Sequence, residues 1–265
     1  MLPRPEILEI AQDRLRETDF LRSIGVATTG YREIADAAAL TRALGELSGR
    51  AVLKSARMGY DGKGQATVAP GTAADKAWRR MGATRGILED FVDFACEISV
   101  IIARARDGAC VAYPPVENRH VDHILDTTVA PAPLPAELAN EAEAIARHIG
   151  ERLELVGVLA VEMFLTRDGR LLVNELAPRP HNSGHWTIDA CMTSQFEQLV
   201  RAVCGLPLGS IERHFDAVMK NLIGDEVETW RDALAEPHAK LHLYGKRAVR
   251  PGRKMGHVTR LTAKR

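Results

Sequence analysis

Hydrophobic positions recur along the chain with two periods, and each period predicts one kind of element. From residue 7 to residue 24 they follow near-helical spacing, and Gly25 is a suitable C-terminal cap. Similar spacing, together with capping residues at the ends, predicts further helices over 36–47, 134–149 and 194–205. The apolar stripe is clearest in the segment 134–149.

Short apolar runs separated by turn residues predict strands. The expected strands are 51–54, 66–69, 86–89, 97–104, 109–113, 158–165, 170–176, 241–244 and 257–261. The glycine-rich segment 57–65 between the first two strands is expected to be a flexible hairpin tip. Because the strands are joined by hairpins and interleaved with a few helices, the fold class is α+β rather than a doubly wound parallel sheet.

Length and composition exclude several classes of protein. The 265 residues, 46% hydrophobic and 26% charged, suffice for one large domain or two small ones. No run approaches the roughly 18 apolar residues of a membrane-spanning helix, and the amino terminus lacks an apolar signal core. We therefore expect a cytoplasmic protein without a membrane partner. The 35 basic residues balance the 35 acidic ones, so no overall field attracts nucleic acid.

Neither the cysteines nor the histidines form a strong metal motif. The four cysteines are scattered and include no C-x-x-C pair, so free thiols are expected. His181 and His185 have the i, i+4 spacing of a helical zinc pair. Pro180 and the loop residues 182–184 argue against a helix there, and so against zinc.

Two carboxylates in a predicted hairpin suggest a metal site. Asp168 and Gly169 are typical of a two-residue type I′ loop. In such a hairpin residue 167 pairs with residue 170, and every further cross-strand pair has residue numbers that add up to 337. Glu162 and Glu175 would then be directly opposed, with Cβ atoms roughly 5 Å apart. Two carboxylates so close among apolar residues need a shared cation, and Mg²⁺ held together with substrate phosphates fits. The alternative is a carboxylate in solvent at a sheet edge, and a bulged or longer turn would break the register.

A glycine-rich segment and a nearby lysine suggest phosphate binding. The segment at the expected hairpin tip consists of Gly59, Tyr60, Asp61, Gly62, Lys63, Gly64 and Gln65. It is not a Walker A loop, because glycine rather than serine or threonine follows the lysine. Its glycines would let backbone N–H groups close over a polyphosphate, although a plain surface turn is an equal alternative. Lys54, at the end of an apolar strand, adds a cation directed at phosphate.

Two more segments concentrate polar donors. The run 174–186 presents, beside two prolines, the side chains of Arg179, His181, Asn182, Ser183 and His185. This density suits an anion or a planar polar substrate. Residues 240–265 contain nine Lys or Arg and no Asp or Glu. Lys246 and Arg253 flank the turn 250–252, which favours a phosphomonoester site over a solvated or nucleic-acid-binding tail.

These motifs together resemble an ATP-grasp family, the 5-(carboxyamino)imidazole ribonucleotide synthases of purine biosynthesis. The resemblance covers nearly the whole chain and rests on the segments 12–14, 59–65, 117–120, 158–163, 174–186, 194–198, 241–246 and 250–257. The run 174–185 is specific to this family among ATP-grasp enzymes. The resemblance implies an ATP-grasp fold with two antiparallel-sheet lobes that clasp ATP, over residues 1–205, with the small lobe at about 27–93. A small β-rich carboxy-terminal domain would follow at 206–265.

The resemblance also implies a ligase reaction. Bicarbonate attacks the γ-phosphate of ATP to give carboxyphosphate, which carboxylates aminoimidazole ribonucleotide and leaves ADP and phosphate. The residues implied in ATP binding are Arg14, Lys54, 59–65, Glu89, Asp90, Phe91, Val92, Glu97, His120, Asn174 and Glu175, with Mg²⁺ on Glu162 and Glu175. Those implied in binding bicarbonate and the imidazole are Arg179, His181, Asn182 and Ser183, while Lys246 and Arg253 would bind the ribonucleotide phosphate. Lys54, Arg179 and His181 are the residues expected to act in catalysis.

One difference from the family bears on activity. Its members are homodimers and carry an α/β domain before the segment that matches 12–14, and here eleven residues precede that segment. Since that domain forms one wall of the substrate pocket in the family, we expect this chain alone to be inactive or uncoupled. Two alternatives stay open: another ATP-grasp ligase that joins a carboxylate and an amine, against which the loop 179–185 argues, and a non-catalytic ATP-binding fragment.

Overall fold

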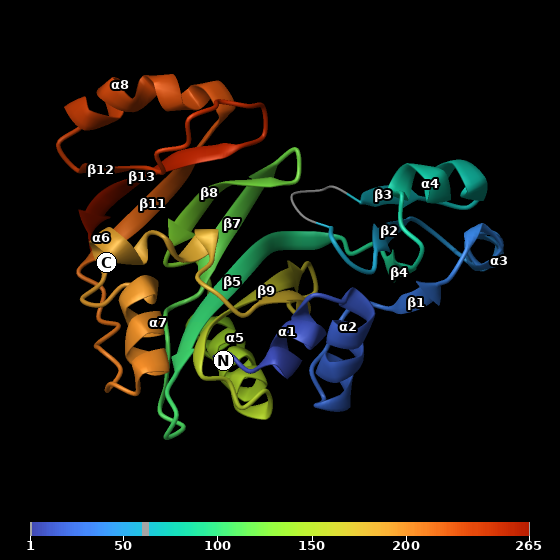
Figure 1. Cartoon of the computed structure of the whole chain (residues 1–265), viewed down its shortest axis with the longest axis horizontal. Coiled ribbons are helices and arrows are strands. Elements are labelled where there is room, and N and C mark those ends of the chain that lie inside the picture. The colour runs from blue at the N-terminus through green and yellow to red at the C-terminus, as the bar shows by residue number, and fades with distance from the viewer. Residues whose placement is uncertain (1, 60–63, 265) are drawn as a thin grey trace. The chain divides into compact units, whose positions relative to one another are not determined.

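The computed structural model describes residues 2–59 and 64–264. The chain forms two compact units (Figure 1). Unit 1 consists of Met1–Arg4, Cys96–Glu162 and Ala177–Arg265, and unit 2 consists of Pro5–Ala95 and Met163–Leu176. Each unit therefore combines segments that are far apart in the sequence.

Unit 2 contains a four-stranded antiparallel sheet. Its strands, in spatial order, are β1 (Tyr31–Ile34), β4 (Gly86–Asp90), β2 (Ala51–Ser55) and β3 (Gln65–Val68). β2 and β3 form the predicted hairpin, in which Lys54 pairs with Gln65. The helices α3 (Ala37–Gly45) and α4 (Ala74–Met81) bury Leu40 and Met81 against Leu53 of the sheet. The predicted helix over 36–47 is confirmed as α3.

The single helix predicted over 7–24 is wrong, because the chain forms two helices there. α1 covers Pro5–Ala11 and α2 covers Arg14–Ser23. Asp13 between them has an extended backbone, and its carboxylate accepts hydrogen bonds from two backbone N–H groups in the first turn of α2. Such an N-cap stabilises a helix start by about 1 kcal/mol. Apolar spacing alone does not reveal this break.

The hairpin between β9 (Gly157–Thr166) and β10 (Leu171–Ala177) differs from the predicted one in its loop. The Thr166 N–H donates to the Arg170 carbonyl at 2.9 Å, and the Gly169 N–H donates to the Thr166 carbonyl at 3.0 Å. Gly169 has a φ of +82°, the left-handed conformation that follows a type I turn in a three-residue loop. The predicted two-residue loop is therefore wrong, and the numbers of paired residues beside it total 336, as 166 and 170 do.

Unit 1 is built on a large sheet. In spatial order its strands are β9, β5 (Phe94–Arg104), β7 (Val116–Val121), β8 (Ile124–Ala130), β11 (Phe215–Ile223), β13 (Lys254–Ala263) and β12 (Ala239–Leu243), with β6 (Cys110–Ala112) beside β5. The pairs from β5 to β12 are antiparallel, in agreement with the predicted α+β class. The strands of the predicted carboxy-terminal domain, 206–265, continue this sheet, so the boundary proposed at residue 205 stays a prediction.

Helices cover parts of this sheet. They are α5 (Ala136–Arg152), α6 (Thr187–Ala190), α7 (Gln195–Cys204) and α8 (Trp230–Ala235), with short 3₁₀ turns η1 at Asn182–Gly184 and η2 at Gly224–Thr229. α7 begins after Ser194 and ends before Gly205, as predicted. α5 continues past its predicted end at Gly150, where a Cβ would lie 2.4 Å from Cδ1 of Ile102. Glycine at this position thus serves close packing rather than helix termination.

The core of unit 1 surrounds two fully buried aromatic side chains. Tyr113 and Trp186 meet edge to face, with ring centroids 6.3 Å apart. The Tyr113 hydroxyl donates to the carbonyl of Thr193 at 2.6 Å. This hydrogen bond links the segment before α7 to the sheet. It therefore holds in place the carboxy-terminal end of the segment that runs from β10 to α7.

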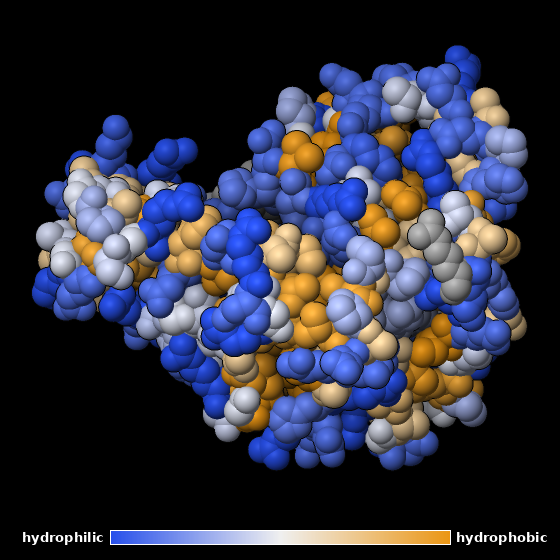
Figure 2. All heavy atoms as spheres, turned by 180° about the vertical axis from the view of Figure 1, so that it is seen from behind, coloured by the Kyte–Doolittle hydropathy of each residue, from blue (hydrophilic) through white to orange (hydrophobic). Residues whose placement is uncertain are grey.

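Apolar side chains also reach the surface. Figure 2 shows them in several groups among hydrophilic ones. Near α7 the most exposed are Met192, Val200 and Leu206, at 59%, 55% and 50%. Exposed apolar residues are normal on folded proteins. Within residues 2–59 and 64–264, no helix has the length and apolar composition needed to cross a membrane.

Candidate active site

Lys54 is a buried cation in unit 2. Its side chain, 10% exposed, places Nζ 2.5 Å from Oε2 of Glu89 on the neighbouring strand. The same Nζ lies 3.4 Å from Oδ1 of Asn174 on β10. A lysine is rarely buried unless it has such partners. Lys54 lies in the predicted strand and is buried there, and its contact with phosphate stays a prediction.

Arg14 is a second cation in unit 2. It opens α2, and its guanidinium lies 2.9 Å from Oε2 of Glu175. One turn later the buried Glu17 accepts a hydrogen bond from the Leu176 N–H at 2.8 Å. Burial opposes the charge on Arg14, but Glu175, Glu17 and Glu89 outweigh it and raise the pKa of Arg14. Burial raises the pKa of Glu17, and Arg14 opposes that shift.

The ends of the glycine-rich loop lie on the hairpin that carries Lys54. Ser55 donates its N–H to the Gly64 carbonyl at 2.7 Å, and Gln65 is the cross-strand partner of Lys54. Gly59 precedes the loop tip and is partly buried. The predicted site residues Tyr60, Asp61, Gly62 and Lys63 lie outside the described residues. The register of the hairpin therefore puts the end of the loop next to the buried lysine.

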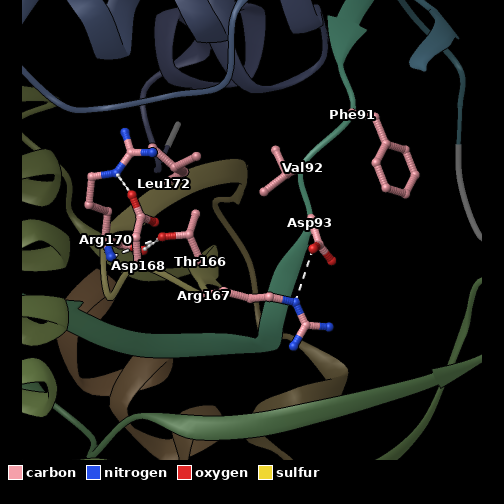
Figure 3. A pocket seen from close by; sticks show the side chains of 8 residues that line it. All are labelled: Phe91, Val92, Asp93, Thr166, Arg167, Asp168, Arg170 and Leu172. Carbon is pink, nitrogen blue, oxygen red and sulfur yellow. Dashed lines mark hydrogen bonds and ion pairs between the residues drawn. The ribbon is translucent and has the colours of Figure 1, made fainter. Parts of the chain in front are cut away.

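Phe91 and Val92, which follow β4 and are predicted to bind ATP, line a cavity. The cavity has a volume of about 330 Å³ and is lined by Phe91, Val92, Asp93, Thr166, Arg167, Asp168, Arg170 and Leu172. Figure 3 shows Arg167 directed at Asp93 and Arg170 at Asp168, with Nε to Oδ2 distances of 3.0 and 2.8 Å. Asp90, also predicted, is exposed at the end of β4. Phe91 is 38% exposed, and the Arg50 guanidinium lies 4.0 Å from its ring centroid.

In unit 1, two predicted nucleotide-site residues form an ion pair. His120 on β7 bonds through Nδ1 to the carboxylate of Glu97 on β5. Burial lowers the pKa of His120, but the hydrogen bond and charge of Glu97, helped by Glu162, outweigh burial and raise it. The structure thus brings together residues 23 positions apart, as the adjacent strands β5 and β7 require.

Glu162, predicted to bind metal, contacts His181. Its Oε1 lies 2.9 Å from Nε2 of His181, and the two side chains are 17% and 12% exposed. Glu162 belongs to unit 1 and Glu175 to unit 2. Because the hairpin loop has the three-residue register, the predicted direct opposition of Glu162 and Glu175 in a regular ladder is wrong. Their role as shared metal ligands stays a prediction that depends on the family resemblance.

The loop after β10 presents some of its predicted donors and buries others. Arg179 is exposed, and its guanidinium bonds the Pro180 carbonyl at 3.1 Å. Asn182 exchanges amide hydrogen bonds with the buried Asn221, at 3.0 and 2.6 Å. Ser183 is fully buried, so its hydroxyl faces the protein rather than a ligand. Of these residues, Arg179 has the greatest freedom to contact a substrate.

Lys246 and Arg253 are both half-buried beside the predicted turn. Lys246 Nζ donates to the Lys254 carbonyl at 2.5 Å and lies 5.4 Å from the ring centroid of Tyr244. Arg253 donates to the Ala248 carbonyl at 2.9 Å. The bonds to backbone hold both cations in place, and the phosphomonoester site stays a prediction.

A group of stacked imidazoles was missed by the sequence analysis. His242 and His257 stack with centroids 4.6 Å apart, and His185 lies 5.1 Å from His257. His242 also bonds Asp189 at 2.8 Å, and Tyr244 bonds His257 at 2.8 Å. Burial, helped by the neighbouring imidazoles, lowers the pKa of His257 to about 3 and that of His185 to about 4. No spacing in the sequence connects three histidines from different elements.

The fold and these groups of residues define an ATP-grasp protein. The family model of the ATP-grasp domain matches residues 19–196, and that of the phosphoribosylaminoimidazole carboxylase C-terminal domain matches residues 217–265. The chain belongs to the ATP-grasp family and, within it, to the N5-carboxyaminoimidazole ribonucleotide synthases. It is therefore an ATP-grasp ligase.

One curated relative and two solved structures illustrate the similarity. The N5-carboxyaminoimidazole ribonucleotide synthase of Brucella melitensis biotype 1 is 49% identical over 263 residues, which cover 98% of this chain and 73% of that protein. The structure of an N5-carboxyaminoimidazole ribonucleotide synthetase in complex with ADP has a TM-score of 0.92 and 44% identity, over 97% of this chain and 68% of that chain. An Aspergillus clavatus synthase in complex with ADP and 5-aminoimidazole ribonucleotide has a TM-score of 0.92 and 30% identity, over 99% and 71%.

Proposed function

We propose that this chain carboxylates 5-aminoimidazole ribonucleotide with bicarbonate and ATP, giving N5-carboxyaminoimidazole ribonucleotide, ADP and phosphate. The observation that supports the ATP-dependent step best is the buried Lys54, held by Glu89 and Asn174. A cation fixed in this way can stabilise charge on a transferring phosphoryl group without reorganising during the reaction. The resemblance of relatives that bind ADP and 5-aminoimidazole ribonucleotide supports the choice of substrate.

Different residues are proposed to bind different parts of the ATP molecule. Arg14 and Lys54 contact the phosphates, and the loop 59–65 covers them. The segment 89–92 and Glu97 contact adenine and ribose, with His120 holding Glu97 through their ion pair. Positioning of bicarbonate against the γ-phosphate then supplies most of the rate acceleration.

We assign Mg²⁺ to Glu162 and Glu175. Carboxylate oxygens are hard ligands of the kind that Mg²⁺ prefers, and the amide oxygen of Asn174 adds another such atom beside Lys54. Within the described part of the chain, no three or more His, Cys, Asp or Glu side chains are arranged to hold a metal by themselves. This suits an ion bound by one or two carboxylates together with substrate phosphates, where it would neutralise charge on the phosphates.

The substrate residues are proposed to lie in unit 1. Arg179, His181 and Asn182 would bind bicarbonate and the imidazole, while Ser183 acts through His181. Lys246 and Arg253 would bind the ribonucleotide phosphate, since both are cations held by backbone carbonyls. A cytoplasmic homodimer is the state that the family resemblance favours.

The proposal is tested by measuring ADP release with MgATP and [¹³C]bicarbonate, with and without 5-aminoimidazole ribonucleotide. With the α/β domain of a family member added as a separate chain, we expect ADP release to depend on the ribonucleotide and to match the formation of a ¹³C-labelled carbamate by NMR. The chain alone should release ADP slowly and without a matching amount of carbamate. Lys54→Met should lose both signals, whereas the exposed Lys76→Met should keep them. With that domain added, ADP release that yields no labelled carbamate with 5-aminoimidazole ribonucleotide would contradict the proposed substrate and leave ATP hydrolysis as the activity.

A further inference from the structure

A continuous chain of side-chain hydrogen bonds crosses the interior of unit 1 and ends at Glu162. Its members, in order, are Thr128 on β8, Asn118 on β7, Ser99 on β5, Ser183 in η1, His181 and Glu162 on β9. The successive contacts measure 3.0, 2.9, 2.7, 2.8 and 2.9 Å. Thr128, Ser99 and Ser183 are fully buried, and Asn118 is 5% exposed. Buried polar groups of this kind need their partners, so the chain is fixed rather than incidental.

The strand register places the first members of this chain. Asn118 is the cross-strand partner of Thr128 on one side and of Glu97 on the other. Ser99 lies two residues beyond Glu97 on the same strand, which makes it a diagonal neighbour of Asn118 on the same face. Ser183 reaches Ser99 because the loop after β10 folds into the 3₁₀ turn η1. The sheet therefore positions a loop side chain that approaches from a distant part of the sequence.

The donors and acceptors from Asn118 to Glu162 fit one direction of hydrogen bonding along the chain. The Asn118 amide nitrogen can only donate, so Ser99 Oγ accepts from it and donates its own proton to Ser183 Oγ. At the other end His181 Nε2 lies 2.9 Å from Oε1 of Glu162, and a proton on Nε2 makes this contact a hydrogen bond from His181 to Glu162. Ser183 Oγ, having accepted from Ser99, is left with its proton for His181 Nδ1.

The backbone gives an independent indication of the same tautomer. The Ser183 N–H, which can only donate, lies 3.4 Å from His181 Nδ1, and this contact caps η1. Nδ1 is thus an acceptor for two groups of the same residue. With Nδ1 as the acceptor, the ring carries its proton on Nε2, directed at Glu162.

We propose that Ser99 and Asn118 are positioning residues for the ligase reaction, which act at a distance by holding His181 in this tautomer. The ring then offers a fixed donor to Glu162, the residue assigned above to Mg²⁺, and orients that carboxylate. This inference depends on the proposed function for its effect on turnover. The tautomer inferred for His181 does not depend on the proposed function.

The wild-type protein provides the first test. In a sample with ¹⁵N-labelled histidine, the two ring nitrogens of each imidazole resonate in separate regions according to whether they carry a proton. The His181 signals are assigned by their loss in His181→Gln. We expect an unprotonated Nδ1 and a protonated Nε2. A proton on Nδ1 would overturn the proposal, because neither Ser183 group could then donate to it.

Ser99→Ala provides the second test. Removing the hydroxyl takes away the donor to Ser183, which weakens donation to His181 Nδ1, so the Nδ1 resonance should shift. Turnover should fall roughly 2- to 13-fold, the effect of losing one neutral hydrogen bond, with the KM for ATP within about twofold of the wild type. Thr259→Val is the matched control, since Thr259 is equally buried on β13 and outside this chain of bonds.

The outcomes separate this inference from the proposed function. An unchanged Nδ1 resonance in folded Ser99→Ala would overturn the inference, as would an equal shift in Thr259→Val. If Ser99→Ala does not fold, the wild-type spectrum decides. A wild type with the expected tautomer that fails to carboxylate the ribonucleotide, even with the α/β domain of a family member added, would instead contradict the proposed function.

Discussion

Two groups of functional side chains, one in each unit, are held by different physical means. In unit 2, Lys54 and Arg14 are paired with Glu89 and Glu175, so charge is balanced by charge. In unit 1, the buried members of the chain from Thr128 to Ser183 are neutral, and they orient His181 through hydrogen bonds. We call these the charged cluster of unit 2 and the neutral network of unit 1.

The difference matches what each group is proposed to bind. A polyphosphate brings several negative charges, and cations that already have carboxylate partners can be buried before it arrives. Bicarbonate and an imidazole are small and need orientation more than charge. If this comparison is right, changes in the charged cluster affect stability and nucleotide binding together. Changes at Lys246 and Arg253, which flank the turn 250–252 and which we call the basic turn, affect binding of the ribonucleotide.

Removal of Lys54 has the largest expected effect. Lys54→Met should lower ATP turnover about 10²- to 10³-fold, because a preorganised donor to the phosphoryl group is lost. It should also lower the free energy of unfolding by about 3–5 kcal/mol, because Glu89 would be left buried and unpaired. Steady-state kinetics and urea unfolding measure the two effects.

A second substitution separates these effects. Adding Glu89→Gln to Lys54→Met removes the unpaired charge, so most of the stability should return while turnover stays low. A double variant as unstable as Lys54→Met would show that the Lys54–Glu89 pair is not what stabilises this part of unit 2.

Glu175→Gln is expected to abolish Mg²⁺-dependent ATP turnover. The glutamine keeps an oxygen for Arg14 but lacks the charge that a divalent ion requires. Because Glu175 is 35% exposed, stability should fall by no more than about 1 kcal/mol. The control is Glu6→Gln, an exposed carboxylate at the start of α1. Retention of full turnover in Glu175→Gln would remove this residue from the metal site.

Lys246→Ala and Arg253→Ala should each weaken binding of the ribonucleotide. Each removes a charge-assisted contact, so the KM for the ribonucleotide should rise roughly 10- to 150-fold, with little change in the KM for ATP. Lys240→Ala removes an exposed lysine of the same basic stretch and should change neither. Equal increases for both substrates would show that the basic turn does not distinguish them.

The imidazole group of unit 1 predicts a smaller, pH-dependent effect on stability. Because the pKa of His257 falls to about 3 in the folded chain, the unfolded chain binds a proton first as the pH drops below about 6.5. Stability from this residue is therefore present above that pH and declines toward pH 3, by about 1.4 kcal/mol per pH unit. Urea unfolding at pH 7, 6 and 5 should show a flatter decline in His257→Gln. Identical slopes in the two proteins would contradict this.

Sequence alone predicted the parts of the fold whose signals are local. Ser194 and Gly205 delimit α7 as expected, and the hairpin of β2 and β3 is in the expected place. The antiparallel α+β class is also confirmed. The strands β1, β7, β8 and β11 and the helix α4 were not predicted, because their short or half-exposed runs lack a clear period and depend on neighbours that are distant in sequence.

The prediction of individual site residues was limited in the same way, because only locally unusual residues could be recognised from the sequence. Lys54 was found because a charge in an apolar strand is unusual in itself. Glu17 and Ser99 were not found, since nothing in the sequence marks a glutamate on a helix or a serine in a strand as buried. The register of Glu162 and Glu175 was wrong because Asp168 and Gly169 fit both a two-residue loop and a three-residue loop, and only the backbone hydrogen bonds distinguish them.

The central claim is that the charged cluster binds the nucleotide and the basic turn binds the ribonucleotide. The most direct test is to measure, by calorimetry, the affinity of two variants for each of the two ligands. Lys54→Met should lower the affinity for MgADP at least about tenfold, as expected for a lost charge-assisted contact, and leave the affinity for 5-aminoimidazole ribonucleotide within about twofold. Lys246→Ala should do the reverse. If both variants lose affinity for both ligands to the same extent, the charged cluster and the basic turn do not serve different substrates, and the central claim is contradicted.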